Sequence, residues 1–349
     1  MLNMKIIFNL RTWALGLGRA PVAWVHPNRA NKLGLLPLIW LVAVVIGCAS
    51  SPAPSPASAT ASPGALPSAN AFGVLVMAHG GSPEWNQGVL DTVMGLKKKY
   101  DVEVAFGMAD ATTIQDAVKK LEARNVRRIG VVRLFVSGES WYERTEQILG
   151  LRPGAPAPSS TPPPADAHAH HGAHGHTMAF FRVATNASFA LSKDGLADAE
   201  GMGTVLADRA AELSKIPARE DVLILAHGPG DDDENARWLA KLDARASAVR
   251  SRLPLRRVQV ETLREDWPEK RVAAEARIRA FAERAVSEGG KAIVIPYRVH
   301  GFGPYAKVLE GIDYTSNGKG LIPHVEVLKW LERQVAALES GAFRAPVAK

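Results

Sequence analysis

The sequence predicts an α/β protein made of two duplicated halves, each built around a parallel sheet. The apolar stretch VLVMAHGG at residues 74–81 recurs as VLILAHGPG at residues 222–230. An asparagine follows each histidine at nearly the same spacing, at Asn86 and at Asn235. Such self-similarity is the signature of a repeated unit. Strand-like and helix-like segments also alternate after each stretch, which is typical of doubly wound parallel sheets covered by helices on both faces.

Each half shows the same order of elements, because short apolar runs alternate with segments of helical periodicity. In the first half we expect a strand at 73–78, a helix at 86–99, a strand at 102–106, a helix at 113–124 and a strand at 128–136. In the second half we expect the same series at 222–226, 234–252, 257–263, 269–287 and 292–297. Two further helices are expected, at 203–215 and at 325–339.

Residues 1–47 have the composition of an export signal. They contain five basic residues and no acidic one, and they include an uncharged apolar run at 33–46 that is short for a bilayer span. The run ends at Cys48, the only cysteine, and its end is similar to the lipobox of bacterial lipoproteins. The resemblance implies lipidation of Cys48 and a membrane-anchored protein facing the periplasm. Ala49 resembles the outer-membrane sorting pattern, whereas a buried cysteine beside a membrane helix is the alternative.

Two low-complexity segments divide the rest of the chain. Residues 48–70 are almost wholly Ser, Pro and Ala and form a tether, since this composition buries too little apolar surface to fold. Residues 151–179 form a linker that is first rich in proline and then rich in histidine. The globular stretches are therefore a first repeat at 71–150 and a second repeat with a C-terminal helix at 180–345.

The linker contains HAHHGAHGH, which holds five of the ten histidines. Such a tract favours weak, multisite binding of Ni, Co, Cu or Zn and suits metal scavenging or delivery. Its predicted metal ligands are His168, His170, His171, His174 and His176.

Most of the excess positive charge lies in the export signal. The whole chain carries 42 basic and 35 acidic residues, for a net charge of +7. Without the five basic residues of residues 1–47, 37 basic residues face 35 acidic ones, which leaves about +2. Nucleic acid is therefore excluded as an expected partner, because its binding requires a basic face on the folded domain.

His79 and His227 each stand at the first position after a predicted strand. In open α/β sheets, ligands bind beyond the carboxyl ends of the strands. A glycine follows each histidine, which allows a sharp turn and a close approach of a ligand to the backbone. A histidine that only caps its strand is the alternative, and its recurrence in both halves favours a functional role.

The motifs resemble those of the class II metal chelatases, the CbiX-like sirohydrochlorin cobaltochelatase group. HGGSP at 79–83 and the stretch at 102–140 look like one repeat, and the stretches at 222–239 and 291–309 look like parts of a second. Members of this family insert Co, Ni or Fe into a tetrapyrrole. The resemblance implies a tetrapyrrole and a divalent metal (Co, Ni, Fe or Zn) as partners, with His79 and His227 as metal ligands or proton acceptors, since neutral imidazole suits both roles.

The sequence departs from the family pattern in the turn after the third strand of each half. Ser140 occupies the place of the family's second histidine, and His300 precedes the matching place in the second half by about three residues. A composite site is therefore expected, in which His300 joins His227, with Glu261 or Glu265 as an oxygen ligand. We favour this second-half set slightly over the first half.

Two other functions are compatible with parts of the sequence. A metal-binding or delivery lipoprotein without catalytic activity would need the same fold, and export fits it because tetrapyrrole synthesis is ordinarily cytoplasmic. A serine esterase would use the turn Gly138-Glu139-Ser140, although the glycine that normally completes such an elbow is missing. The acidic run at 231–234 fits a helix N-terminus better than a metal site, and His324 is expected to start the last helix.

Overall fold

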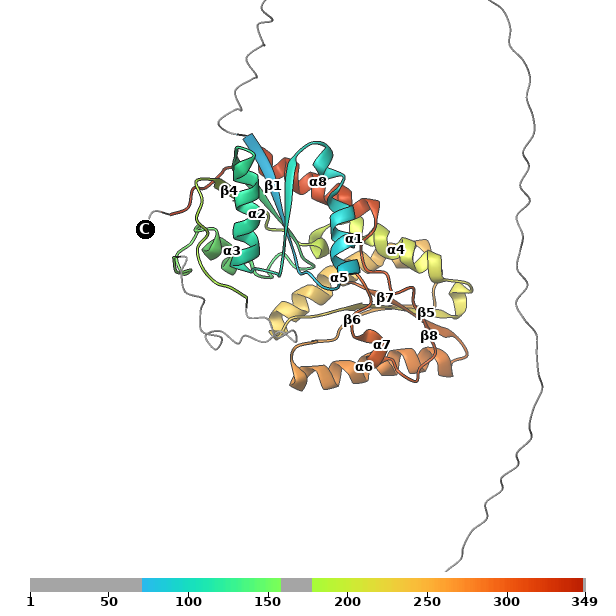
Figure 1. Ribbon diagram of the computed structural model, residues 1–349. Helices are drawn as coiled ribbons and strands as arrows, with labels where there is room; N and C mark the ends of the chain where they lie inside the picture. The colour runs from blue at the N-terminus through green and yellow to red at the C-terminus, as the bar shows by residue number, and fades with distance from the viewer. Residues whose placement is uncertain (1–70, 158–177, 348–349) are drawn as a thin grey trace, which may run out of the picture. The chain divides into compact units, whose positions relative to one another are not determined.

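A computed structural model describes residues 71–157 and 178–347 of the chain (Figure 1). The predicted export signal, Cys48, the predicted tether and the histidine tract lie outside the described residues. No helix within the described part of the chain is both long and apolar enough to cross a membrane.

The first sheet consists of parallel strands in the order β2-β1-β3-β4. These strands are β1 (Ala71–Ala78), β2 (Asp101–Phe106), β3 (Val126–Leu134) and β4 (Ser188–Leu191). The elements that connect them are α1 (Pro83–Val93), η1 (Leu96–Lys98), α2 (Ala111–Ala123) and α3 (Tyr142–Ile148).

The second sheet repeats the order of the first, as β6-β5-β7-β8. Its strands are β5 (Glu220–Ala226), β6 (Arg257–Thr262), β7 (Lys291–Pro296) and β8 (Tyr314–Thr315). The other elements are η2 (Leu196–Asp198), α4 (Gly201–Leu213), η3 (Pro217–Arg219), α5 (Asp232–Arg252), α6 (Pro268–Ser287), α7 (Tyr305–Val308) and α8 (Val325–Glu339). The shared strand order confirms the predicted duplication and the α/β fold class.

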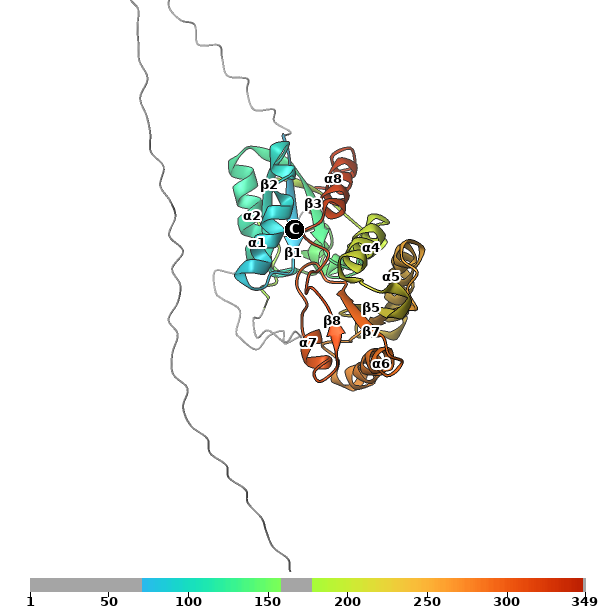
Figure 2. The ribbon, with the colours of Figure 1, turned by 90° about the vertical axis from the view of Figure 1, so that its right-hand side faces the viewer.

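One apolar core joins the two sheets. It combines Val76 of β1 and Ile224 of β5 with buried side chains of α1, α4, α5 and α8. Separate cores cover the opposite faces, with α2 and α3 against the first sheet and α6 and α7 against the second. Figure 2, read with Figure 1, shows α6 and α7 on the side of the second sheet that faces away from the first. The halves are thus built on a common interior.

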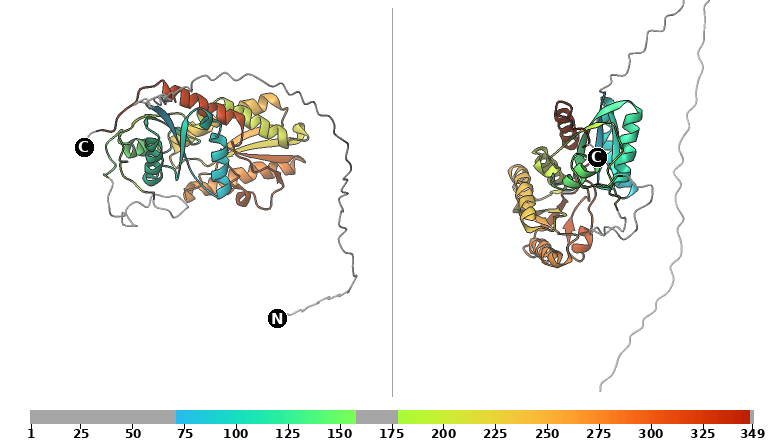
Figure 3. Two further views of the ribbon diagram at one scale, coloured as in Figure 1. Left: turned by 45° about the horizontal axis from the view of Figure 1, so that its top comes forward. Right: turned by 90° about the vertical axis from the view of Figure 1, so that its left-hand side faces the viewer.

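The first half extends further along the chain than its sequence suggests. Strand β4 lies after residue 180 but pairs with β3, so the expected boundary falls before the last strand of the first sheet. Helix α8 contacts β3, β4 and α1, and Figure 3 shows it, in red, beside the first sheet. Arg344 and Phe189 then exchange main-chain hydrogen bonds of 2.8 and 2.9 Å. The C-terminal helix that we assigned to the second repeat therefore also completes the first.

Helix α1 begins and ends earlier than its apolar pattern predicts. The Ser82 hydroxyl accepts a hydrogen bond from the Trp85 main-chain N–H at 3.2 Å, and Pro83 occupies the first turn, where its missing N–H costs nothing. The helix ends at Val93, before Gly95, rather than at residue 99. Helix α8 begins as predicted, with His324 Nδ1 accepting from the Glu326 N–H at 3.2 Å.

Candidate functional site

The two strand-end histidines have the same local geometry. Nδ1 of His79 lies 2.7 Å from the oxygen of Gly80, and Nδ1 of His227 lies 2.7 Å from the oxygen of Gly228. Both glycines have a left-handed backbone, with φ of 82° and 79°, which side chains other than glycine rarely adopt. In the tautomer that donates from Nδ1, Nε2 carries the lone pair that binds a metal or a proton. The duplication has therefore preserved a chemical feature as well as a fold.

His227 is held beside two carboxylates that follow β6. Its Nε2 lies 3.1 Å from Asp266 Oδ2 and 3.8 Å from Glu265 Oε2, and a third of its side chain is exposed. Burial alone lowers the pKa of His227, but the hydrogen bond to Asp266 and the charges of Glu265 and Asp266 outweigh burial and raise this pKa. Because oxygen acceptors face both ring nitrogens, the doubly protonated ring is favoured.

Charges from both halves act on Asp266. The hydrogen bond from His227 lowers the pKa of Asp266 most, burial opposes this effect, and the positive charges of His227, His79 and Arg298 lower the pKa further. His79 comes from the first half, whereas Asp266 and Arg298 come from the second. The carboxyl ends of β1 and β5 are thus close enough to act on one another electrostatically.

His300 occupies the turn after β7. In the first half, the main-chain oxygen of Val136 accepts a hydrogen bond from the Ala197 N–H at 2.8 Å. In the second half, the main-chain oxygen of Val299 accepts the equivalent bond from the Ile322 N–H at 2.9 Å. His300, which follows Val299, therefore matches Ser137 and stands three residues before the position that matches Ser140. This register agrees with the displacement expected from the sequence.

The His300 side chain crosses to the first half. Its ring centroid lies 6.4 Å from that of Trp85, and Trp85 lies 6.3 Å from His79 by the same measure. A Cβ added to Gly88 of α1 would lie 2.8 Å from His300 Cδ2. His300 is therefore part of the cross-half group around His79 and Trp85, rather than of a site confined to the second half.

The two predicted glutamates have different surroundings. Glu265 lies near His227 and forms a close ion pair with Arg298. Glu261 is buried, and its carboxylate contacts Arg277 of α6 at 3.3 Å and Gln259 at 3.0 Å. Side chains along a strand alternate between its two faces. The contact with Arg277 places the Glu261 side chain on the face of β6 that is covered by α6, so Glu261 is not brought to His227.

Sequence reasoning missed the closest carboxylate. Asp266 follows directly on Glu265 and contacts His227 more closely, at 3.1 Å against 3.8 Å. The available signal was the Glu-Asp-Trp sequence immediately after a predicted strand. Within residues 71–157 and 178–347, no group of three or more His, Cys, Asp or Glu side chains is arranged to hold a metal ion.

The turn that contains Ser140 is held in place by a buried arginine. The guanidinium of Arg133, which is almost fully buried, donates to the main-chain oxygens of Gly138 and Ser140, at 2.5 and 2.6 Å. Burial lowers the pKa of Arg133 to about 10. The acidic run at 231–234 lies at the N-terminus of α5, as expected, and the Asp231 side chain caps this helix by accepting a hydrogen bond from the Glu234 N–H at 2.8 Å.

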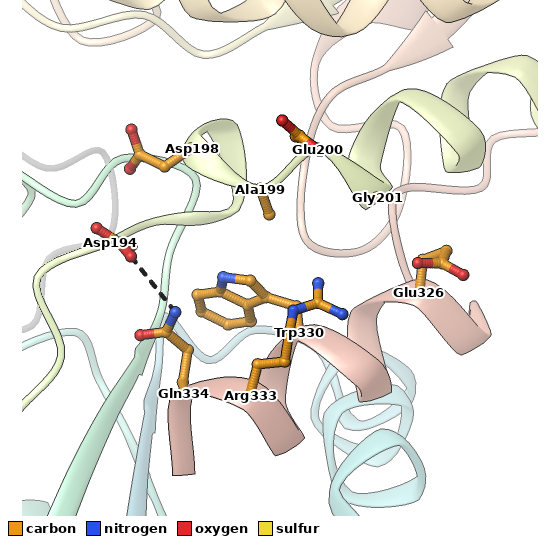
Figure 4. Close-up of a pocket in the computed structure, with 9 residues that line it drawn as sticks. All are labelled: Asp194, Asp198, Ala199, Glu200, Gly201, Glu326, Trp330, Arg333 and Gln334. Atoms are coloured by element: carbon orange, nitrogen blue, oxygen red, sulfur yellow. Dashed lines mark hydrogen bonds between the residues drawn. The ribbon is translucent and has the colours of Figure 1, made fainter. Parts of the chain in front are cut away.

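A separate acidic cavity lies beside the N-terminal part of α8 (Figure 4). Asp194, Asp198, Glu200 and Glu326 line it together with Trp330 and Arg333. Its acids are already partnered in part, because Asp198 binds Lys241 at 2.9 Å and Glu326 binds Lys329 at 2.8 Å. None of the predicted site residues lines this cavity.

Comparison with known proteins agrees with the fold. Residues 73–149 match the CbiX family model, whereas no curated protein matches the sequence. The chain is similar in structure to SirB from Bacillus subtilis with Fe³⁺, with a TM-score of 0.50 and 14% identity over 76% of this chain and 96% of that one.

Two further solved structures are similar. SirB, a sirohydrochlorin chelatase from Bacillus subtilis subspecies spizizenii in complex with cobalt, has a TM-score of 0.49 and 13% identity over 78% of this chain and 99% of that one. A multi-domain protein of Deinococcus radiodurans with structural similarity to chelatases has a TM-score of 0.44 and 19% identity over 76% of this chain. The present chain spans 55% of the Deinococcus protein.

The strand order and the similarity to SirB give the chain a chelatase-like α/β fold. More particularly, the first half of the chain contains a CbiX domain, at residues 73–149.

Proposed function

We propose that the protein binds a divalent transition metal between its two halves and inserts it into a tetrapyrrole such as sirohydrochlorin. The observation that carries this proposal is the pair of strand-end histidines, His79 and His227, which make the same main-chain contact and whose positive charges both lower the pKa of one carboxylate, Asp266. Imidazole nitrogen suits Co²⁺, Ni²⁺ and Fe²⁺, so the site chemistry fits the metals expected from the sequence.

Metal insertion exchanges one divalent cation for two protons. The tetrapyrrole loses the protons of two pyrrole N–H groups, and its four nitrogens then bind the metal as a neutral core. The protein must present the metal and accept the protons. His79, which is exposed, is suited to presenting the metal. His227, once it has released a proton to solvent, is suited to accepting a pyrrole proton beside Asp266.

The test is cobalt and nickel insertion into sirohydrochlorin, followed by absorbance, with the purified full chain. We expect acceleration over the uncatalysed rate, and a loss of about 100-fold or more in His227→Ala, as is typical when a group that transfers protons is removed. His324→Asn is the matched control, since it removes a histidine but keeps a residue that caps α8. A folded protein that binds metal without accelerating insertion would instead be a metal-binding or delivery protein.

We also propose that the protein is exported and lipidated at Cys48, and that the histidine tract collects metal for the site. The support is the basic and apolar composition of residues 1–47, the lone cysteine and the five clustered histidines. Labelling of cells with a radioactive fatty acid tests the anchor, and Cys48→Ser should abolish the label. Replacement of the five histidines by alanine should lower the number of bound Ni²⁺ ions without changing insertion at saturating metal.

A further inference from the structure

In both halves, an indole ring covers the turn that follows the strand-end histidine. Trp85 packs on Gly81, where an added Cβ would lie 3.0 Å from the Trp85 Cγ. Trp267 packs on Gly230 so closely that an added Cβ would overlap its indole. The indoles also lie beside the imidazoles, with centroid distances of 6.3 Å for Trp85 and His79 and 6.1 Å for Trp267 and His227. Each turn therefore needs glycine because a tryptophan approaches its backbone.

Gene duplication does not explain this arrangement, because the two tryptophans come from different places in their halves. Trp85 belongs to the first turn of α1, which follows β1. Trp267 is the N-cap of α6, which follows β6. Non-equivalent positions have thus supplied an indole ring at a similar distance from each histidine. An independent origin of this kind favours a requirement of the site over inheritance from a common repeat.

Both tryptophans are half-buried, so each residue keeps part of its surface open to solvent. Trp85 also has ring contacts with Phe106, at 6.4 Å, and His300, at 6.4 Å. Its ring is thereby fixed in orientation by neighbours from both halves. A rigid, partly exposed aromatic ring is suited to stacking against a flat aromatic ligand.

We propose that Trp85 and Trp267 form the stacking surface for a planar aromatic macrocycle, with one indole beside each strand-end histidine. This inference rests on the proposed function, since it assigns the residues that recognise the ring of the same substrate. The indoles set the position of the ring, and the histidines then act on the metal and the protons at its centre.

The experiment measures binding of metal-free uroporphyrin to the full chain by quenching of tryptophan fluorescence, with no metal present. We expect about tenfold weaker binding in Trp85→Leu and in Trp267→Leu, and near wild-type binding in Trp85→Phe and Trp267→Phe, because phenylalanine keeps a stacking ring. Trp330→Phe is the control, since Trp330 is buried in α8 and lines the separate acidic cavity. Circular dichroism verifies that each variant is folded.

The outcomes separate this inference from the proposed function. Indole-dependent porphyrin binding without metal insertion would support the stacking surface and contradict the chelatase activity. Metal insertion with unchanged porphyrin binding in folded Trp85→Leu and Trp267→Leu would overturn the stacking surface and leave the activity standing. Failure of the folded wild-type chain to bind uroporphyrin would also overturn it.

Discussion

At the scale of the residue, His227 and Asp266 form the best-defined interaction of the candidate site. The raised pKa of His227 means that its charge stabilises the fold fully below its ordinary pKa of 6.5, and that this stability is lost as pH rises through the raised pKa. The lowered pKa of Asp266 means that its charge stabilises the fold above 3.8, and that this stability is lost as pH falls through the lowered pKa. The pair therefore contributes most between these limits.

Asp266→Asn should separate a proton-accepting role from a metal-binding role. Without the carboxylate, the pKa of His227 falls, so the pH midpoint of metal insertion should move to lower pH while the maximal rate changes less. The measurement is the insertion rate as a function of pH for wild type and variant. A uniform loss of Co²⁺ affinity at every pH would instead make Asp266 a direct metal ligand.

Gly88→Ala should test the placement of His300. Alanine favours a helix interior by about 1 kcal/mol over glycine, but the added Cβ would lie 2.8 Å from His300 Cδ2. We expect the melting temperature to be unchanged or higher and metal insertion to be slower, because the His300 ring must move.

The control for Gly88 is Gly95→Ala, where the added Cβ would lie 2.7 Å from Leu328, a residue of α8 outside the site. Equal insertion rates for wild type and Gly88→Ala would show that the position of His300 does not matter.

The histidines of the candidate site can be predicted from the sequence, but the side chains that contact them cannot. His79, His227 and His300 are found by their places after strands, since strand ends are read from apolar runs. The sequence does not show that Asp266, rather than Glu261, contacts His227. The face to which each side chain points depends on the residue at which β6 ends, and a shift of one residue turns the side chain to the opposite face. Packing of Trp85 and His300 across the halves leaves no mark in local spacing.

At the scale of the element, the cap of α1 links helix stability to the site. Ser82→Ala removes the oxygen that accepts the Trp85 N–H, at 3.2 Å, and should lower the free energy of unfolding by about 1 kcal/mol. Ser82→Asp should restore stability, because aspartate also caps and favours a helix N-terminus. Urea denaturation of the three proteins gives the comparison, and identical midpoints would remove any role of the cap.

Elements of strong periodicity are predicted well, and short ones are not. The bounds of α8 and most strands follow from their apolar patterns, whereas β4 has four residues and β8 has two, too few to show a pattern. Helix α1 was placed late because its first turn, Pro83 to Trp85, reads as part of the turn after β1. Its start is determined by the Ser82 cap rather than by an apolar stripe.

At the scale of the whole molecule, the shared core predicts that the two halves fold together. Val327, Leu331 and Val335 of α8 are fully buried in that core, beside residues of both sheets. A chain that ends at residue 324 should therefore lose the cooperative unfolding of both halves, since removal of α8 exposes the faces of β3 and β4. Thermal unfolding followed by near-ultraviolet circular dichroism tests this, and a retained cooperative transition would contradict it.

The central claim is that one site is assembled from both halves. It is tested most directly by the rates of cobalt insertion into sirohydrochlorin for His79→Ala, His227→Ala and the double variant. Residues that act as a unit are strongly non-additive. The account predicts that each single variant loses nearly all of the acceleration and that the double variant is no worse. Two single variants that each keep about half of the activity, with a double variant that has none, would show two independent half-sites and contradict the account.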